Sequence, residues 1–143
     1  MSLAWLYWTV MKTSKLVAIS LLLGWVIATS GCYFSSTKME FNRAERAYKE
    51  KDYQTARKYY LRVLKRDPNT KLAMTSAEKV ARLLVEELHS YDEAVNIYRF
   101  LIIKAQDPEQ VKDYQLRLAT VLYENIQNYT EAINEFNKLI KLE

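Results

Sequence analysis

The sequence predicts an all-α protein: three stacked helical hairpins, which form a short solenoid, preceded by an apolar signal helix. The first observation is that both glycines, all three tryptophans and the single cysteine fall within the first 32 of 143 residues. Glycine adopts positive φ at little cost in free energy, so the part of the chain after residue 32, which lacks glycine, is poorly suited to hairpin-rich sheets. The second is that residues that begin helices are followed by apolar residues at helical spacing. The third is an internal repeat whose three units follow at equal intervals.

The N-terminal segment has the pattern of an export signal. Lys12 and Lys15 follow a second methionine, Met11, and residues 16–31 carry no charge. This apolar run is shorter than the roughly 20 residues that span a bilayer. It ends in Ala28, Thr29, Ser30 and Gly31 directly before Cys32.

Small residues before a lone cysteine resemble the lipobox of bacterial lipoproteins. The resemblance implies a signal peptide over 1–31, a diacylglyceryl group on the Cys32 thiol and a short tether over 32–37. Residues 1–10 carry no charge and precede a signal that is already complete from Met11, which favours Met11 over Met1 as the start of translation. An acylated Cys32 would anchor the protein to a membrane without spanning it. An uncleaved signal anchor, or a buried apolar helix with an incidental cysteine, remains the alternative.

The same resemblance implies a location in the bacterial cell envelope. Enterobacterial lipoproteins retained at the inner membrane carry Asp after the cysteine, whereas this chain has Tyr33. We therefore expect the periplasmic face of the outer membrane, with the inner membrane as the less favoured alternative.

Three segments, residues 52–60, 90–98 and 128–136, align without gaps, and the interval from Ala56 to Ala94 equals that from Ala94 to Ala132. They open with Asp52, Ser90 and Asn128, whose side chains can cap a helix. Apolar residues then recur at helical spacing, so each segment begins the second helix of a hairpin. Tyr53, Tyr91 and Tyr129 occupy one position in all three, which predicts a packing role in the core.

A first helix is expected before each of these. Thr37 with Glu40 forms a candidate capping box, Asn69 or Thr70 can begin the next, and Asp107 precedes Pro108 at a helix start. The predicted domain is therefore 38–143, with hairpins over 38–68, 69–106 and 107–143.

Asp52, Tyr53, Ala56, Tyr60 and Val63, followed by Asp67 and Pro68, resemble the second half of a tetratricopeptide (TPR) repeat. The usual period of that family is about 34 residues, and the interval here is longer by about one helical turn. Arg82 and Thr120 fall where the first helix of the family carries glycine. Longer repeats of this kind resemble those of periplasmic TPR lipoproteins of outer-membrane assembly.

The resemblance implies that the first helices line a concave groove that binds a peptide or a partner helix. Aligned position by position, the expected groove residues are Phe41, Glu45, Tyr48, Lys49, Lys79, Leu83, Glu86, Glu87, Tyr114, Arg117, Val121, Glu124 and Asn125. The asparagines of the carboxylate clamp found in chaperone-binding TPR domains are missing, so capture of a C-terminal carboxylate is not expected.

These features predict a noncatalytic scaffold that binds other envelope proteins through its groove. The alternative is a signal-anchored periplasmic chaperone or holdase that binds unfolded clients. The apolar stripe of Ile133, Phe136, Leu139, Ile140 and Leu142 also predicts that a partner, a second copy or further residues cover the last helix.

Composition argues against several other functions. One cysteine and one histidine, His89, cannot supply a zinc site, and no pattern indicates a catalytic residue or a cofactor. Residues 38–82 hold 13 basic and 6 acidic side chains, whereas residues 83–143 hold 6 basic and 11 acidic ones. Because basic residues predominate only in the first part of the domain and acidic residues in the second, nucleic acid is not expected as a partner.

Overall fold

The computed structural model describes residues 36–141, and every regular element in this part of the chain is a helix. Thr37–Glu143 form one compact unit. The expected signal peptide, the Met11 start and Cys32 lie outside the described residues. No helix in the described part combines the length and the apolar character needed to cross a bilayer.

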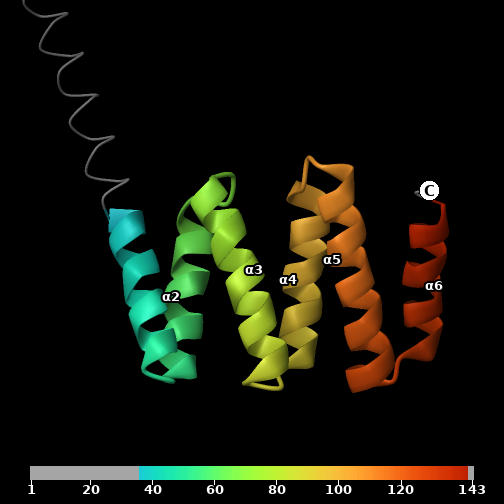
Figure 1. Cartoon of the computed structure of the whole chain (residues 1–143), viewed down its shortest axis with the longest axis horizontal. Helices are drawn as coiled ribbons and strands as arrows, with labels where there is room; N and C mark the ends of the chain where they lie inside the picture. Colours follow the sequence, from blue (N-terminus) through green and yellow to red (C-terminus); the bar gives the residue numbers. More distant parts are fainter. Residues whose placement is uncertain (1–35, 142–143) are drawn as a thin grey trace, which may run out of the picture. The chain divides into compact units, whose positions relative to one another are not determined.

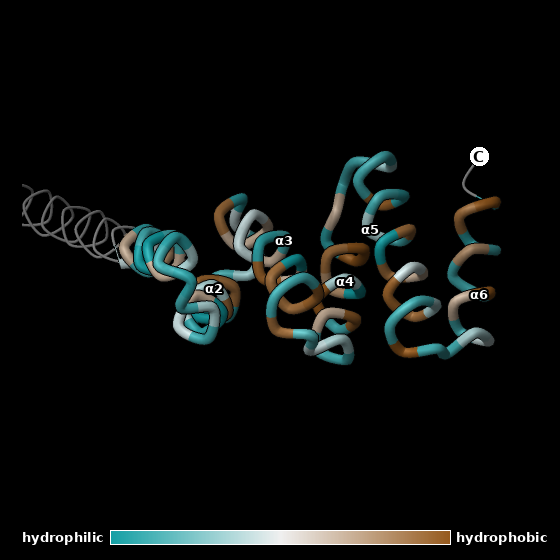
Figure 2. The backbone as a smooth tube through the Cα atoms, turned by 60° about the horizontal axis from the view of Figure 1, so that its bottom comes forward, coloured by the Kyte–Doolittle hydropathy of each residue, from teal (hydrophilic) through white to brown (hydrophobic). Residues whose placement is uncertain are grey.

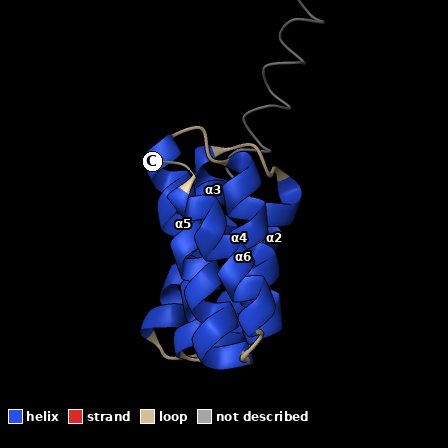
Figure 3. Ribbon diagram, turned by 90° about the vertical axis from the view of Figure 1, so that its right-hand side faces the viewer, coloured by secondary structure: helices blue, strands red, loops and turns tan. Residues whose placement is uncertain are grey.

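The helices pair into three hairpins that stand side by side in chain order (Figure 1), and Figure 3 shows helices and loops only among the described residues. This confirms the predicted all-α solenoid of stacked hairpins. From α2 onward, each α-helix packs against the next one in the sequence. The elements are a first helix over residues 36–49, α2 (Tyr53–Arg66), α3 (Lys71–Glu86), α4 (Tyr91–Lys104), α5 (Pro108–Val121), a π-helical turn η1 (Leu122–Ile126) and α6 (Tyr129–Ile140).

Most predicted helix starts are confirmed. The side chains of Asp52, Thr70 and Asn128 each accept a hydrogen bond from the backbone N–H three residues later, at 3.1, 3.2 and 3.3 Å. Asp107 accepts from the N–H of Glu109 at 3.1 Å and precedes the helix-starting proline. α4 begins directly after Ser90, as predicted, but the predicted side-chain cap is wrong, because the Ser90 hydroxyl donates to the Leu88 carbonyl and accepts no capping hydrogen bond.

The predicted capping box at Thr37 is also wrong. Residue 36 is already helical, so Thr37 lies within the helix and is buried there. Glu40 instead accepts a hydrogen bond from Arg66 of α2 at 3.2 Å. Residues 36 and 37, which were expected to belong to the tether over 32–37, are therefore part of the helix.

The three hairpin turns use the left-handed region without glycine. Lys51, His89 and Gln127 have φ of 60°, 51° and 61°, and they occupy the same position in the three units. For a residue with a Cβ atom this conformation costs roughly 1–2 kcal/mol. The absence of glycine thus did not prevent positive φ; it left three positions that are conformationally strained.

Lys51→Gly is therefore expected to raise the free energy of unfolding by about 1 kcal/mol, because glycine adopts positive φ without that cost. Denaturant unfolding of the full chain measures the change. Lys58→Gly, in the interior of α2, is the control and should lower stability by roughly 0.5–1 kcal/mol. A loss at position 51 as large as that at 58 would contradict the turn geometry.

Between the buried alanine of the first helix (Ala44, Ala81 or Ala119) and the residue with positive φ, the second and third hairpins contain one more residue than the first hairpin does. The N–H of Asp52 binds the Ala47 carbonyl five residues back, whereas Ser90 and Asn128 bind carbonyls six residues back. In the third hairpin the extra residue is accommodated by the wider turn of η1. In the second hairpin it is accommodated by a hydrogen bond from the Leu88 N–H to the Leu83 carbonyl, five residues back.

This insertion corrects the expected position of the small residue in the first helices. Ala44, Ala81 and Ala119 are all fully buried. The step from Ala44 to Ala81 is one residue shorter than the step from Ala56 to Ala94. The gap-free alignment places Arg82 and Thr120 at this position, one residue too late. Close packing of the hairpins is thus provided by alanine in all three units.

The hydrophobic core runs along the stacked hairpins and draws on every helix described. Its largest fully buried side chains include Tyr60 of α2, Leu83 and Leu84 of α3, and Leu101 of α4. Figure 2 shows hydrophobic segments alternating with hydrophilic ones along the helices. Between α5 and α6 the core also holds a polar pair, since Gln115 donates to the buried carboxylate of Glu135 at 2.6 Å.

The repeated tyrosines do not share one environment. Tyr53 and Tyr91 are half-buried and pack against the core, whereas Tyr129 is 51 % exposed, so the prediction that all three are core residues is wrong for the last. No helix of the described part packs beyond α6. For the same reason Ile133 and Ile140 of α6 are 56 % and 69 % exposed.

Candidate functional site

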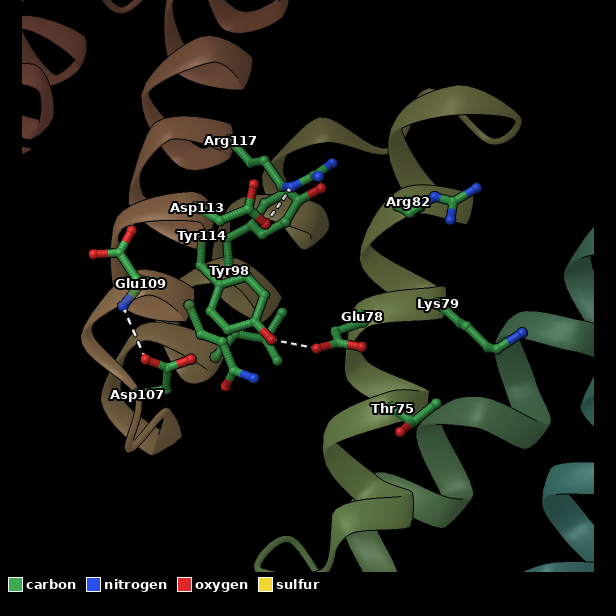
Figure 4. A pocket seen from close by; sticks show the side chains of 12 residues that line it. Thr75, Glu78, Lys79, Arg82, Tyr98, Asp107, Glu109, Asp113, Tyr114 and Arg117 are labelled. Carbon is green, nitrogen blue, oxygen red and sulfur yellow. Dashed lines mark hydrogen bonds and ion pairs between the residues drawn. The ribbon is translucent and has the colours of Figure 1, made fainter.

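A groove of about 540 Å³ lies between α3 and α5, with α4 contributing to its floor. Figure 4 shows side chains of α3 and α5 reaching toward one another across it. The lining is mainly polar and carries both signs of charge. It comprises Thr75, Glu78, Lys79, Arg82, Tyr98, Leu101, Asp107, Glu109, Gln110, Asp113, Tyr114 and Arg117.

Two interactions fix the shape of this groove. The Tyr114 hydroxyl of α5 donates to the Glu78 carboxylate of α3, which bridges the two walls. Burial, reinforced by the Glu78 carboxylate, raises the pKa of Tyr114 above its usual range, so the phenol remains a donor. On α5 itself, Arg117 Nε donates to Asp113 Oδ2 at 2.8 Å. That hydrogen bond raises the pKa of Arg117, so this cation stays charged.

The floor adds a buried phenol. Burial raises the pKa of Tyr98, and the positive charge of Arg117 opposes this rise. The groove therefore presents neutral hydroxyl groups beside charges that are already paired. Such a surface can exchange hydrogen bonds and ion pairs with a polar peptide.

A related network joins α3 to the first helix. Lys79 Nζ lies 2.8 Å from Glu45 Oε1, and the Tyr60 hydroxyl of α2 donates to the same carboxylate. Burial alone would raise the pKa of Glu45, but the hydrogen bonds from Lys79 and Tyr60 outweigh it and lower the pKa below the ordinary value of 4.5. The ionised form of Glu45 thus stabilises the packing of the first two hairpins.

This shift predicts a pH dependence of stability. Because the pKa of Glu45 is lower in the folded state, its contribution is present above pH 4.5 and is lost as the pH falls through the folded pKa. In Glu45→Gln the melting temperature should be lower at pH 7 and should decline less steeply below pH 4.5. Thermal unfolding between pH 7 and 3 measures this, with Glu50→Gln as control. Parallel declines in the wild type and Glu45→Gln would contradict the network.

The structure brings four of the expected groove residues into these networks: Glu45, Lys79, Tyr114 and Arg117. Phe41 instead packs edge-on against Tyr60, with ring centroids 5.9 Å apart, and Tyr48 packs against Tyr53 at 5.8 Å. The remaining polar residues of the predicted set are exposed but do not line the groove: Lys49, Glu86, Glu87, Glu124 and Asn125.

The prediction of Leu83 and Val121 as groove residues is wrong, because both are buried in the core and offer no surface to a partner. The one-residue insertion explains the error. A gap-free alignment shifts each residue in the first helix of the second and third hairpins by one position, which corresponds to a rotation of about 100° about the helix axis. The prediction omits Glu78 and Arg82. These residues follow Phe41 and Glu45 at the same sequence interval at which Ala81 follows Ala44. Aligning the buried alanines would have identified them. No feature of the sequence identified Asp113 or Tyr98 as a groove residue.

The described residues contain no cluster of three or more His, Cys, Asp or Glu side chains that could hold a metal ion. The acidic groups of the groove are instead occupied by protein donors, as Glu78 is by Tyr114 and Asp113 by Arg117. The arrangement is suited to recognising a polypeptide.

Comparisons with known proteins agree with this geometry. Models of the tetratricopeptide repeat match residues 40–70 and 113–142. Among solved structures, the chain is similar to the N-terminal domain of stress-induced protein-1 (STI-1) from C. elegans, with 18 % identity and a TM-score of 0.64 over 77 % of this chain and 86 % of that one. It is also similar to the Arabidopsis OM64 TPR domain, with 20 % identity and a TM-score of 0.57 over 78 % and 85 % of the two chains.

No curated protein sequence matches the chain. At these identities the solved structures support the fold, and the family models identify the repeats within it. The first and third hairpins thus contain tetratricopeptide repeats, in a six-helix solenoid of the TPR type.

Proposed function

We propose that this protein is a noncatalytic scaffold that binds a segment of a partner protein in the groove between α3 and α5. The observation that carries the proposal is the groove itself, a hollow of about 540 Å³ whose walls are bridged by the contact of Tyr114 with Glu78. TPR repeats are interaction modules, which supports the same function. A preformed groove favours binding because little ordering is needed on the protein side.

The lining indicates the kind of segment that fits. It offers hydroxyl groups and charges of both signs, and its one aliphatic lining residue, Leu101, is fully buried. This suits a peptide with polar and charged side chains. It does not suit a holdase, which needs a broad apolar surface to capture unfolded clients.

A displayed library of random dodecapeptides tests the proposal with the full chain as bait. We expect peptides that bind the wild type and are lost on Tyr114→Phe/Arg117→Gln, which removes the bridge and one cation of the groove. Ile103→Ala is the matched control, because Ile103 is 78 % exposed and does not line the groove. Peptides that survive the groove variant, or no enrichment on the wild type, would contradict the proposal.

We further propose that the scaffold is anchored in the bacterial cell envelope, at the periplasmic face of the outer membrane, through acylated Cys32. The support is the sequence: basic residues at 12 and 15, an uncharged run over 16–31, and small residues directly before the only cysteine. Metabolic labelling with palmitate should mark the wild type but not Cys32→Ser, which should also leave the membrane fraction. An unlabelled wild type would overturn the anchor.

A further inference from the structure

The first hairpin carries two rows of basic side chains on its exposed surface. Four lie on the first helix and three on α2, and all seven are exposed. We call this surface the basic face. Its members are Lys38, Arg43, Arg46, Lys49, Lys58, Arg62 and Lys65.

The two rows meet at the half-buried ring of Tyr59. The guanidinium carbon of Arg43 lies 5.9 Å from the ring centroid, and that of Arg62 lies 5.3 Å from it. One ring thus holds two cations from different helices close together. Their mutual repulsion is relieved when an anion binds nearby. The basic face is therefore continuous across the seam between the helices.

Most of the charge of this surface is not neutralised by ion pairs in the described part of the chain, although Lys49 interacts electrostatically with the Glu45 carboxylate. Among the residues that the structure describes, none of the seven forms an ion pair, whereas Arg57, Arg99 and Arg117 are each paired with a carboxylate. The acidic side chains Glu40 and Glu45 of the first helix are already bound, to Arg66 and Lys79. Residues 38–68 hold 10 basic and 5 acidic side chains, and residues 107–143 hold 4 and 7.

We propose that the basic face docks on the anionic headgroups of a phospholipid bilayer. This proposal rests on the proposed membrane attachment, because residue 36 follows Cys32 by only four positions, a reach of about 14 Å at roughly 3.5 Å per residue. The cations spread over two helices, and the hollow beside them, lined by Glu40, Arg62, Lys65 and Arg66, is shallow. Such a surface fits an array of phosphates better than one enclosed ligand.

Docking would also orient the scaffold. The first hairpin would lie against the bilayer, while the net negative third hairpin would be repelled from it. The groove between α3 and α5 would then remain open to a partner. Removal of two cations from the basic face should weaken docking about 25-fold, since one basic side chain near an anionic surface contributes about fivefold.

The test uses the full chain with phosphatidylcholine vesicles, with and without phosphatidylglycerol as a minor component. Phenylglyoxal modifies exposed arginines, and mass spectrometry reports the rate at each site. We expect Arg43 and Arg62 to be protected only on the anionic vesicles, and this protection to vanish in about 0.5 M salt. Arg82, which is 58 % exposed and lies outside the basic face, is the internal control.

Two variants complete the design. Lys58→Gln/Lys65→Gln should reduce the protection of Arg43 and Arg62, whereas Lys138→Gln/Lys141→Gln, on or next to α6, should not. Unfolding curves of both variants identify any loss of folding. If folded Lys58→Gln/Lys65→Gln retains full protection, the basic face is not the docking surface.

Flotation of the same vesicles separates this proposal from the membrane anchor. A chain that floats with both vesicles but gains no protection on the anionic ones overturns docking and leaves the anchor. A chain that floats only with anionic vesicles supports docking and overturns the anchor, and one that floats with neither overturns both. Protection by poly-glutamate but not by lipid would assign the basic face to an acidic protein and overturn lipid docking.

Discussion

Leu84→Ala is expected to lower the free energy of unfolding by about 3 kcal/mol. Leu84 lies in α3, is fully inaccessible to solvent and belongs to the core that all three hairpins share. Its truncation leaves a cavity among side chains held by helices on both sides, so the site cannot easily collapse. Urea unfolding of the full chain in a mild detergent, followed by circular dichroism, measures the loss.

The matched control for Leu84→Ala is Ile103→Ala. Ile103 lies in the neighbouring helix α4 but is 78 % exposed, so its truncation should change stability by less than about 0.5 kcal/mol. If both variants lose the same stability, the core does not lie where the structure places it. If Leu84→Ala unfolds in a separate early transition, the hairpins do not fold as one cooperative unit.

Ala81→Arg is expected to cost about 3–5 kcal/mol, because it places an unpaired charge in the core. The adjacent Arg82→Ala should change stability by less than about 1 kcal/mol, since Arg82 is exposed and its contact with Glu86 is a 3.5 Å surface ion pair. The two variants differ by one position in the chain. They therefore test directly which residue of the second hairpin faces its neighbours.

A gap-free alignment of the three units predicts the opposite order of effects. It places position 82 at the buried contact, so Arg82→Ala would stabilise the protein and Ala81→Arg would be tolerated. Ala119→Arg provides a second test in the third hairpin, where the buried alanine precedes Thr120. Tolerance of arginine at both alanines would show that the one-residue insertion is wrong.

The sequence predicted the fold because its signals are local. Helix starts at Asp52, Thr70, Asp107 and Asn128 depend on a side-chain oxygen reaching an N–H two or three residues away. Ser90 shows the limit, because it precedes α4 as predicted but its hydroxyl donates to the Leu88 carbonyl and accepts no capping hydrogen bond. Which residue caps a helix thus depends on the turn before it.

The groove was harder to predict because it depends on rotation about a helix axis. A single inserted residue turns a helix by about 100°, which exchanges core and groove positions such as Leu83 and Arg82. The insertion lies in η1 and in the turn after α3, where helical hydrogen bonding changes and no sequence motif indicates it. Buried polar residues such as Glu135 were missed for a similar reason, since their partners come from another helix.

Two polar groups of the groove already have hydrogen-bond partners within the protein. The hydroxyl of Tyr114 and the guanidinium of Arg117 each have a protein partner, Glu78 and Asp113. A bound peptide must share or replace these contacts, so its affinity depends on geometry more than on net charge. This favours a specific partner segment over any acidic or basic chain.

The most direct test of the central claim, that this groove binds a partner protein, is photo-crosslinking in the living cell. A photoreactive amino acid is placed at Arg82, on the groove wall, or at Ile103, outside the groove. We predict a discrete adduct of one added protein from position 82 and none from position 103. No adduct from position 82, or the same adduct from both positions, would contradict the claim.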